Sequence, residues 1–224
     1  MPRYRARSWR AFDPSAVTQA ASTAGSAPAG GTVRAKSAAV VRLAPVTKVR
    51  ILGIDPGSQR TGYGVIECNG ANSTSLVHGC IAVQGDSLND RLRRIFEGVQ
   101  DLVDRFRPDE VAIERVFVNR NVDSALKLGH ARGAALCAVP SAMPVFEYTP
   151  RAVKLAIVGF GNAEKAQVAH MIRTLLTVQG KLTADASDAL AVAMCHAHSR
   201  RVDALARSAG VTVAIGGATM GRTR

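Results

Sequence analysis

The sequence lacks the patterns that mark zinc-finger, disulfide-rich and membrane proteins. Its four cysteines, Cys68, Cys80, Cys137 and Cys195, lie far apart and form no C-x-x-C pair. This spacing argues against a zinc site or a disulfide framework and is typical of a reducing, cytoplasmic compartment. No apolar run approaches the ~20 residues that a membrane span needs, so we expect no membrane association. At 47% hydrophobic and 21% charged residues, the 224-residue chain has material for a buried core, which excludes wholesale disorder.

Acidic residues are nearly absent from the first 50 positions, where Asp13 stands alone against nine Lys and Arg residues. Residues 20–39 are almost all Ala, Ser, Thr, Gly and Pro, with neither helical nor strand periodicity. Residues 1–48 are therefore predicted to be a disordered basic extension. Two other interpretations stay open: a transit peptide, which has a similar composition, and true translation that begins near Val49.

A second loose segment is predicted at the other end. Residues 200–224 hold five arginines among Gly and Ala and are expected to form a loose basic C-terminal tail. Residues 49–199 then make up one folded domain. Positions 51–224 carry a net charge of only +4, which is weak support for a polyanionic partner such as nucleic acid.

Hydrophobic periodicity within this domain predicts strands followed by alternating helices and strands. The first three strands are joined by short turns, which favours an antiparallel meander. Thr149 before Pro150 indicates a helix N-cap followed by proline at the first helical position. The predicted strands are 49–55, 61–67, 76–83, 110–114 and 144–148, and the predicted helices are 88–106, 125–139, one from 150, 163–177 and 184–198. This order predicts an α/β fold in which a mixed sheet, with three antiparallel strands and then parallel strands, is flanked by helices.

Four carboxylates stand where a site would form. Asp55 ends the first predicted strand and Glu114 ends the fourth, and acids at the ends of central strands lie over the mouth of a sheet. Asp185 and Asp188 are three positions apart on the last helix, so they share a face among small apolar residues. Mg²⁺ prefers hard oxygen ligands of this kind, and two such ions can flank a phosphodiester.

Each acid also has a purely structural interpretation. Asp55 is suited to the turn that Pro56 and Gly57 predict, and Asp185 is suited to an N-cap of the last helix. Glu114 has two candidate ion-pair partners near it in the sequence, Arg115 and Arg120. Spacing alone leaves the structural and the metal-binding interpretations open.

Small residues form a stripe on the second predicted helix. Ala125, Gly129 and Gly133 recur every four positions and therefore lie on one face. Glycine inside a helix costs ~1 kcal/mol against alanine, so a close contact is expected to compensate. The contact is either the same face of a second subunit or the protein's own sheet.

The composition and order of these motifs resemble those of the RuvC-type Holliday-junction resolvases, the crossover junction endodeoxyribonucleases. The motifs that carry the resemblance are residues 53–58 (GIDPGS) with 61–66 (TGYGVI), 112–117 (AIERVF), 123–133 (DSALKLGHARG) and 185–191 (DASDALA). They follow the family's order from about 49 to 198, roughly two thirds of the chain. The family lacks an extension like residues 1–48.

The resemblance implies a ribonuclease-H-like fold and a homodimer that cuts two symmetric strands of a four-way DNA junction in recombination and repair. It implies two Mg²⁺ ions per subunit, with Mn²⁺ as a substitute, and products with 5′-phosphate and 3′-hydroxyl ends. It also implies the RuvA–RuvB branch-migration complex as a partner. Carried over position by position, the catalytic and metal-binding acids are Asp55, Glu114, Asp185 and Asp188.

The resemblance also implies DNA contacts. Phe117 matches a family position that contacts junction bases, and an aromatic in a polar loop suits stacking or wedging. From the residues alone, the alternative is a loop aromatic packed into the core. Lys154 and Lys165 match basic positions that the family uses on DNA. Arg115 and Arg120 are expected to contact phosphates, with a solvated surface as the alternative.

Two other protein classes fit part of the pattern. Residues 53–61 have the Gly-Ile-Asp-x-Gly-x-x-x-Thr form of the first phosphate loop in the actin, Hsp70 and sugar-kinase superfamily. That superfamily needs two such domains, and the sequence has one copy. Loss of any acid would favour a non-catalytic nucleic-acid-binding protein, but all four are present. Magnesium-dependent nicking of a synthetic junction separates the three classes.

Overall fold

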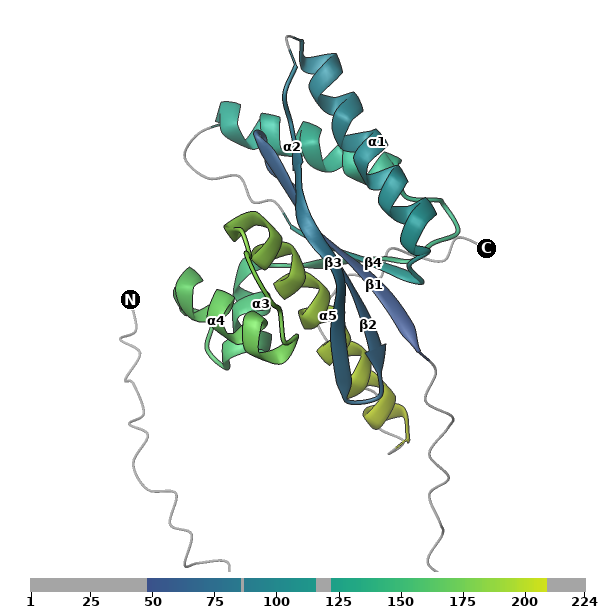
Figure 1. The fold of residues 1–224 in the computed structure, drawn as a ribbon, viewed down its shortest axis with the longest axis vertical. Helices are drawn as coiled ribbons and strands as arrows, with labels where there is room; N and C mark the ends of the chain where they lie inside the picture. The colour runs from purple at the N-terminus through teal and green to yellow at the C-terminus, as the bar shows by residue number, and fades with distance from the viewer. Residues whose placement is uncertain (1–47, 86, 116–121, 209–224) are drawn as a thin grey trace, which may run out of the picture. The chain divides into compact units, whose positions relative to one another are not determined.

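The computed structural model of the chain describes residues 48–85, 87–115 and 122–208. Strands and helices follow one another in the predicted order (Figure 1). The strands are β1 (Val49–Asp55), β2 (Arg60–Asn69), β3 (Asn72–Ala82), β4 (Glu110–Glu114) and β5 (Val145–Tyr148). The helices are α1 (Leu88–Phe106), α2 (Val122–Cys137), α3 (Pro150–Val158), α4 (Lys165–Leu175) and α5 (Ala184–Ser208). The β2–β3 hairpin is longer than predicted, because its strands extend to a tight turn at Gly70, whose φ is 61°.

The described strands form one sheet in the order β3-β2-β1-β4-β5. Strands β1, β2 and β3 pair antiparallel, as a meander of short turns requires. Strand β4 pairs parallel to β1, and β5 pairs parallel to β4. The predicted mixed sheet is confirmed, and β1 and β4 lie next to each other at its centre.

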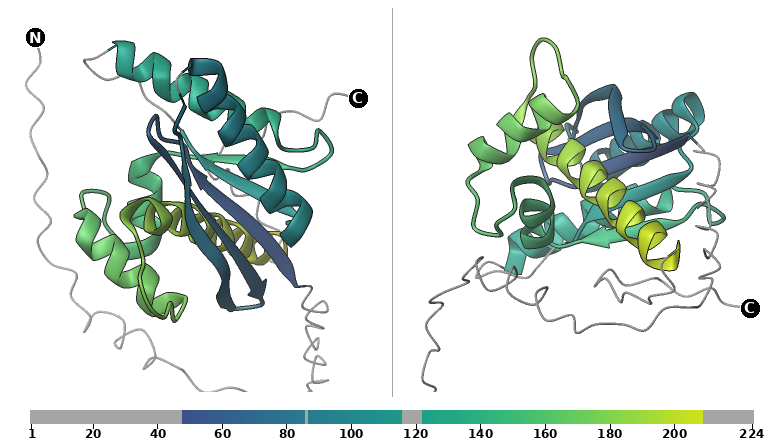
Figure 2. Two further views of the ribbon diagram at one scale, coloured as in Figure 1. Left: turned by 45° about the horizontal axis from the view of Figure 1, so that its top comes forward. Right: turned by 90° about the horizontal axis from the view of Figure 1, so that it is seen from below.

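Helices cover both faces of the sheet (Figures 1 and 2). On one face, α1 and α2 pack on a core that includes Leu52, Ile54 and Val111. On the other face, α3, α4 and α5 enclose a core that includes Ile51 and Ala112. Side chains alternate along each strand, so successive residues of β1 and β4 contribute to opposite cores.

Helix α5 runs to Ser208, so the prediction of a loose tail from residue 200 is wrong for residues 200–208. No glycine or proline interrupts this stretch, and its Ala, Arg and Leu residues favour helix. Arg200 anchors the added turn, because its Nε lies 2.8 Å from Glu110 Oε2. Residues 209–224 lie outside the described part of the chain, as do residues 1–47 of the predicted extension.

The small-residue face of α2 does not pack on its own sheet. A Cβ at Gly129 or Gly133 would meet nothing within 4 Å among the described residues, and the helix is buried through Ala131 and Ala135 instead. The interpretation of this stripe as packing against the protein's own sheet is therefore wrong. In the described part of the chain, no helix is both long and apolar enough to cross a membrane.

Candidate active site

Two of the predicted acids are brought together by the sheet. Asp55 and Glu114 are the last residues of β1 and β4. These strands are parallel neighbours, with Ile54 opposite Ile113, so their carboxyl ends meet at one edge. A chain separation of 59 positions thus becomes a contact between adjacent strands. Side-chain hydrogen bonding links the two carboxyl groups.

Glycines on β1 and β2 let α5 approach this edge. A Cβ at Gly62, the strand partner of Asp55, would overlap the backbone carbonyl oxygen of Asp185. A Cβ at Gly53 would overlap the carbonyl oxygen of Ala189, and one at Gly64 would crowd Leu190. We name Gly53, Gly62 and Gly64 the glycine seat of α5. Because the seat carries no side chains, the first turns of α5 lie directly against the sheet beside Asp55.

The N-terminus of α5 is capped by a residue other than the predicted one. Thr183 Oγ1 accepts a hydrogen bond from the Ala186 amide at 3.4 Å, and the Thr183 carbonyl accepts one from the Ser187 amide at 2.9 Å. Asp185 is therefore in the first turn, and its interpretation as the N-cap is wrong. Its carboxylate lies 4.0 Å from the guanidinium of Arg60, and the two form a loose, partly exposed ion pair.

Electrostatics at the edge are those of crowded acids. Burial, the negative charge of Glu114 and its hydrogen bond, and the negative charge of Asp188 together raise the pKa of Asp55 to about 8. Burial and the charge of Asp188 also raise the pKa of Glu114, against the opposing effect of its hydrogen bond with Asp55. Three of the four predicted acids thus influence one another, and their negative charges are incompletely balanced.

Two lysines supply the nearest positive charge. Lys165 Nζ lies 2.8 Å from Asp188 Oδ2, and this hydrogen bond and ion pair raise the pKa of Lys165. Lys154 is close enough to Glu114 to oppose the rise in its pKa. The positions of both lysines follow from helix starts: Thr149 caps α3 and Pro150 opens it, while a capping box of Glu164 and Gln167 opens α4 at Lys165.

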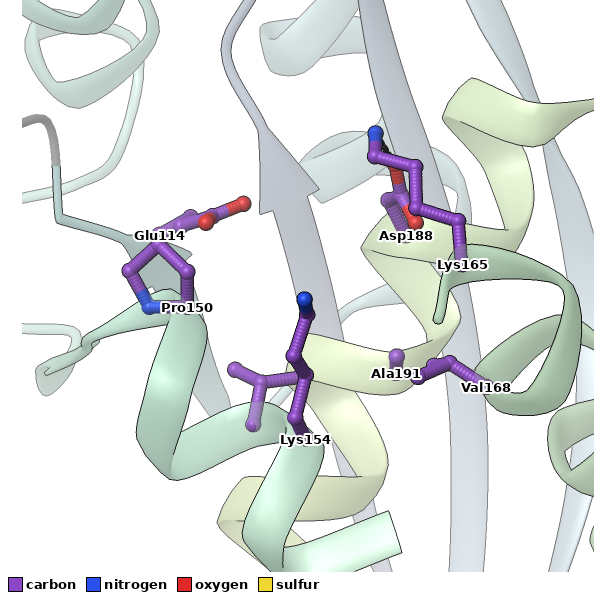
Figure 3. Close-up of a pocket in the computed structure, with 8 residues that line it drawn as sticks. Glu114, Pro150, Lys154, Lys165, Val168, Asp188 and Ala191 are labelled. Carbon is purple, nitrogen blue, oxygen red and sulfur yellow. Dashed lines mark hydrogen bonds and ion pairs between the residues drawn. The ribbon is translucent and has the colours of Figure 1, made fainter. Parts of the chain in front are cut away.

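Two of the acids and both lysines line one pocket: Glu114, Asp188, Lys154 and Lys165 (Figure 3). Glu114 and Asp188 face it from opposite sides, and Lys154 rises between them. Its floor is apolar, formed by Val153, Val168 and Ala191. The remaining lining residue is Pro150. The pocket therefore combines acids and cations with apolar lining residues, which strengthen charge interactions beside them.

The acids suit a divalent cation by their chemistry. Their donors are carboxylate oxygens, which Mg²⁺ and Mn²⁺ prefer. Burial and the negative charge of neighbouring acids raise the pKa values of Asp55 and Glu114, so a cation would stabilise the ionised forms of these two. Within residues 48–85, 87–115 and 122–208, no three acid, histidine or cysteine side chains already surround one point closely enough to hold a metal. Asp188 is paired with Lys165 and Asp185 with Arg60, each through its Oδ2, so the second oxygen of each carboxylate is the one left for a cation.

Arg115 is held by a different acid from the one expected. Its Nε lies 3.3 Å from Oε2 of Glu147, whose other oxygen accepts a hydrogen bond from Arg132. The interpretation of Glu114 as the partner of Arg115 is therefore wrong. The remaining predicted DNA contacts divide: Lys154 and Lys165 lie at the pocket, whereas Phe117 and Arg120 fall outside the described residues.

Sequence reasoning missed the direct partners of these side chains. Lys165 and Asp188 are 23 positions apart, and Arg115 and Glu147 are 32 apart, so no local spacing links them. The glycine seat had a partial signal, because glycines recur inside strands that are otherwise apolar. Nothing in the sequence said which helix would fill the space above them.

A family model described as crossover junction endodeoxyribonuclease RuvC matches residues 51–196. The curated protein of that name from Methylococcus capsulatus is 56% identical over 153 residues, which cover 68% of this chain and 92% of that protein. Its counterpart from Shewanella amazonensis is 53% identical over 152 residues, which cover 67% of this chain and 88% of that protein. Each match covers most of the relative and leaves about a third of this chain unmatched.

Solved structures agree with the sequence relatives. T. thermophilus RuvC, in a complex with a Holliday junction substrate, superposes with a TM-score of 0.65 at 35% identity, covering 69% of this chain and 96% of that one. The yeast mitochondrial Holliday junction resolvase Ydc2 has a TM-score of 0.50 at 13% identity, covers 73% of this chain and 87% of that one, and shares the fold alone. The expected ribonuclease-H-like fold is confirmed. The chain belongs to the RuvC family of crossover junction endodeoxyribonucleases.

Proposed function

We propose that this protein is a structure-selective endonuclease that resolves four-way DNA junctions by paired nicks. The observation that carries the proposal is the convergence of Asp55, Glu114 and Asp188 at one edge of the sheet, with raised pKa values for the first two. Relatives more than 50% identical bear the name crossover junction endodeoxyribonuclease, and one structural relative holds a Holliday junction. Chromosomal DNA as substrate would place the protein in the cytoplasm.

The proposed metal ligands are the four acids Asp55, Glu114, Asp185 and Asp188, and the proposed cofactor is two Mg²⁺ ions per subunit, for which Mn²⁺ substitutes. When bound, such ions supply a reactive water at neutral pH and positive charge at the leaving oxygen. The acids would hold them at the carboxyl edge of β1 and β4, where α5 lies on the glycine seat. Loss of the shared proton from Asp55 and Glu114 would accompany binding, because ligating carboxylates are deprotonated.

Lys154 and Lys165 are proposed to hold the scissile strand. Both ammonium groups line the same pocket as Glu114 and Asp188, so a phosphate there would meet positive charge beside the acids. In the reaction, a water oxygen bonds to phosphorus and the P–O3′ bond breaks, which leaves 5′-phosphate and 3′-hydroxyl ends. Phe117, Arg120 and the exposed part of Arg115 are the further proposed DNA contacts. The RuvA–RuvB branch-migration complex is the proposed partner.

A homodimer would account for the open face of α2. Val122 and Leu126 are 64% and 57% exposed, and Gly129 and Gly133 leave room for a second backbone among the described residues. Apolar side chains beside glycines on one helix face are suited to close packing against a partner helix. A twofold axis there would present two sites to two strands of a junction, whose arms are themselves related by symmetry.

The proposal is tested with a synthetic four-way junction, MgCl₂ and mapped nick positions. We expect nicks at paired, symmetric positions that DNA ligase reseals without prior treatment, since ligase requires a 5′-phosphate and a 3′-hydroxyl. Asp55→Asn should keep junction binding and lose cleavage by roughly a thousandfold or more, the scale of lost transition-state charge stabilisation. Asp101→Asn, at an exposed acid of α1, is the matched control and should cut normally.

Two outcomes would contradict the proposal. Normal cleavage by Asp55→Asn would remove the acids from the mechanism. Junction binding by the wild-type protein without cleavage in Mg²⁺ or Mn²⁺ would leave a non-catalytic binding protein, and ATP consumption without nicking would indicate a phosphotransferase.

A further inference from the structure

A buried hydrogen-bonded network lies at the opposite end of β4 from the acids. His196 of α5 is 2% exposed, and its two ring nitrogens both have partners. Nε2 lies 2.6 Å from Oε2 of Glu110, and Nδ1 lies 2.7 Å from the hydroxyl oxygen of Tyr148. Arg200, one turn further along α5, also binds Glu110. We name Glu110, Tyr148, His196 and Arg200 the α5 clamp.

The roles of donor and acceptor in the clamp follow from its chemistry. An ionised carboxylate only accepts, so Nε2–H of His196 donates to Glu110. Burial raises the pKa of Tyr148 to about 12, so its hydroxyl keeps its proton beside Nδ1. Burial would raise the pKa of Glu110, but the His196 hydrogen bond and the Arg200 charge outweigh it and hold that pKa below its usual value. Each ring nitrogen of His196 thus has one polar partner.

The rest of the ring is fixed by packing. Phe146 of β5 stacks on His196 with ring centroids 4.2 Å apart. Phe146 and Tyr148 alternate along β5 and therefore face the same core as α5. The imidazole is thus enclosed by side chains from β4 and β5 and joined to both strands, which leaves it one position.

The distance between the α5 clamp and the acids is nearly the same along β4 as along α5. Glu110 and Glu114 stand at the two ends of β4, about 13 Å apart at the usual strand rise, and both face α5. Asp188 and His196 are separated by about 12 Å along α5 at the usual helical rise. The helix runs antiparallel to the strand, with Asp188 beside Glu114 at one end and His196 on Glu110 at the other. The hydrogen bond between His196 and Glu110 at one end of β4 therefore determines that Asp188 lies beside Glu114 at the other end.

From this match we infer that His196, held by Glu110 and Tyr148, is a positioning residue that fixes the register of α5 on β4 and so brings Asp188 opposite Glu114. The inference rests on the proposed function for its catalytic meaning. The glycine seat supports the need for such a device near Asp185, because Gly62 meets only the backbone of α5 there. A contact between backbone and glycine limits how close α5 lies to the sheet more than its position along the sheet.

The clamp extends beyond the matched part of the family. The family model ends at residue 196, and Arg200 adds a second bond to Glu110 from the turn that follows. The two bonds reach one carboxylate from successive turns of α5, so sliding or rotation of the helix would strain both at once. The register of α5 on β4 is therefore set by hydrogen bonds, which have a defined geometry, as well as by apolar contacts.

The test uses His196→Gln, which keeps a polar group but has no ring to bridge both partners, and Tyr148→Phe, which removes one hydrogen bond. Val99→Ala is the control, since Val99 is buried in α1 on the other face of the sheet and touches neither the clamp nor the acids. The first readout is hydrogen–deuterium exchange over residues 186–195 of the metal-free, full-length protein. The second is Mn²⁺ binding to the same protein, followed by the electron paramagnetic resonance signal of free Mn²⁺.

For His196→Gln we expect exchange near Asp188 to rise by about tenfold and Mn²⁺ affinity to fall by about tenfold, the scale seen when outer-shell partners of metal ligands are removed. Tyr148→Phe should change both in the same direction by less. Val99→Ala should lower the melting temperature without either local change. The exchange measurement needs neither metal nor DNA, so it tests the clamp independently of junction cleavage.

The inference is overturned if His196→Gln leaves exchange over residues 186–195 at the wild-type level, or if Val99→Ala reproduces both effects. A wild-type protein that fails to cut junctions while His196→Gln still loosens the start of α5 would overturn the proposed function and leave the clamp standing.

Discussion

The two ends of the seam between β4 and α5 present the same residue type in opposite electrostatic states. Glu114, at one end, has a raised pKa because it is buried and lies near the negative charge of Asp188. Glu110, at the other end, has a lowered pKa although it is also partly buried, because His196 and Arg200 donate to it. Strand, face and helix are shared, so the difference comes from the deeper burial of Glu114 and from the neighbours of each glutamate.

The comparison shows where the fold is complete and where it is open to a ligand. At the Glu110 end every charge has a protein partner, so binding another ion there would gain little. At the Glu114 end the acids outnumber the cations that touch them: Lys165 hydrogen-bonds to Asp188 and acts on Asp55 and Glu114 only through its charge. Such an excess of negative charge lowers the stability of the free protein, and it is expected at a site where a bound cation supplies the missing positive charge.

The largest effect should come from breaking the close approach at the acid end. Gly62→Ala places a Cβ on the carbonyl oxygen of Asp185, so α5 must lift off the sheet or the strand must shift. We expect the free energy of unfolding to fall by about 2–3 kcal/mol, the usual cost of overpacking, and junction cleavage to be lost. Urea unfolding and the junction assay measure the two effects.

Gly129→Ala is the matched control for that substitution. Gly129 lies inside α2, where a Cβ meets nothing within 4 Å among the described residues. Alanine there should raise the stability of a subunit by up to ~1 kcal/mol. Equal stability of Gly62→Ala and the wild-type protein would show that α5 does not rest on the glycine seat.

A pH titration without metal should separate the two ends next. The pKa of Asp55 rises from 3.8 to about 8 on folding, so the folded protein binds a proton that the unfolded chain has released. Stability from this group is full below pH 4 and is lost as the pH rises toward 8. In EDTA, Asp55→Asn should therefore gain stability over the wild-type protein across this interval, by an amount on the order of 2 kcal/mol.

Urea unfolding of both proteins at each pH gives the difference directly. Saturating Mg²⁺ should reverse its sign at pH 8, because only the wild-type acids can hold the ion fully. A difference that stays constant from pH 4 to pH 8 would mean that Asp55 is ionised in the folded protein throughout.

Periodicity and motif order were enough to predict the mixed sheet and to place Asp55 and Glu114 at the ends of central strands; the structure adds that these strands are neighbours. Both features are local: each strand has its own apolar pattern, and each acid follows directly after one. The partners that set the charge state of the site are not local. Lys165, at the start of α4, pairs with Asp188 of α5, and Glu147 of β5 pairs with Arg115. The partners in each pair are too far apart in the sequence for local spacing to predict them.

The end of α5 shows the same limit. Arginines among small residues resemble a solvated tail, and only the position of Glu110, 90 residues earlier, makes Arg200 an anchor. Helix propensity permitted the extra turns without requiring them. Tertiary contacts decided the matter, as they decided that Arg115 would be tied to Glu147.

The smallest expected effect is also the most direct test of the comparison. Glu114→Gln removes a charge that its neighbours repel, so in EDTA it should raise the free energy of unfolding by about 1 kcal/mol. Glu110→Gln removes a charge to which His196 and Arg200 donate, so it should lower the free energy of unfolding by about 1–2 kcal/mol. The two substitutions are chemically identical and lie on one strand, so differences in unfolded-state behaviour largely cancel. Urea unfolding at pH 7 measures both, and a shared sign would mean that the neighbours of these two glutamates do not determine their energetics.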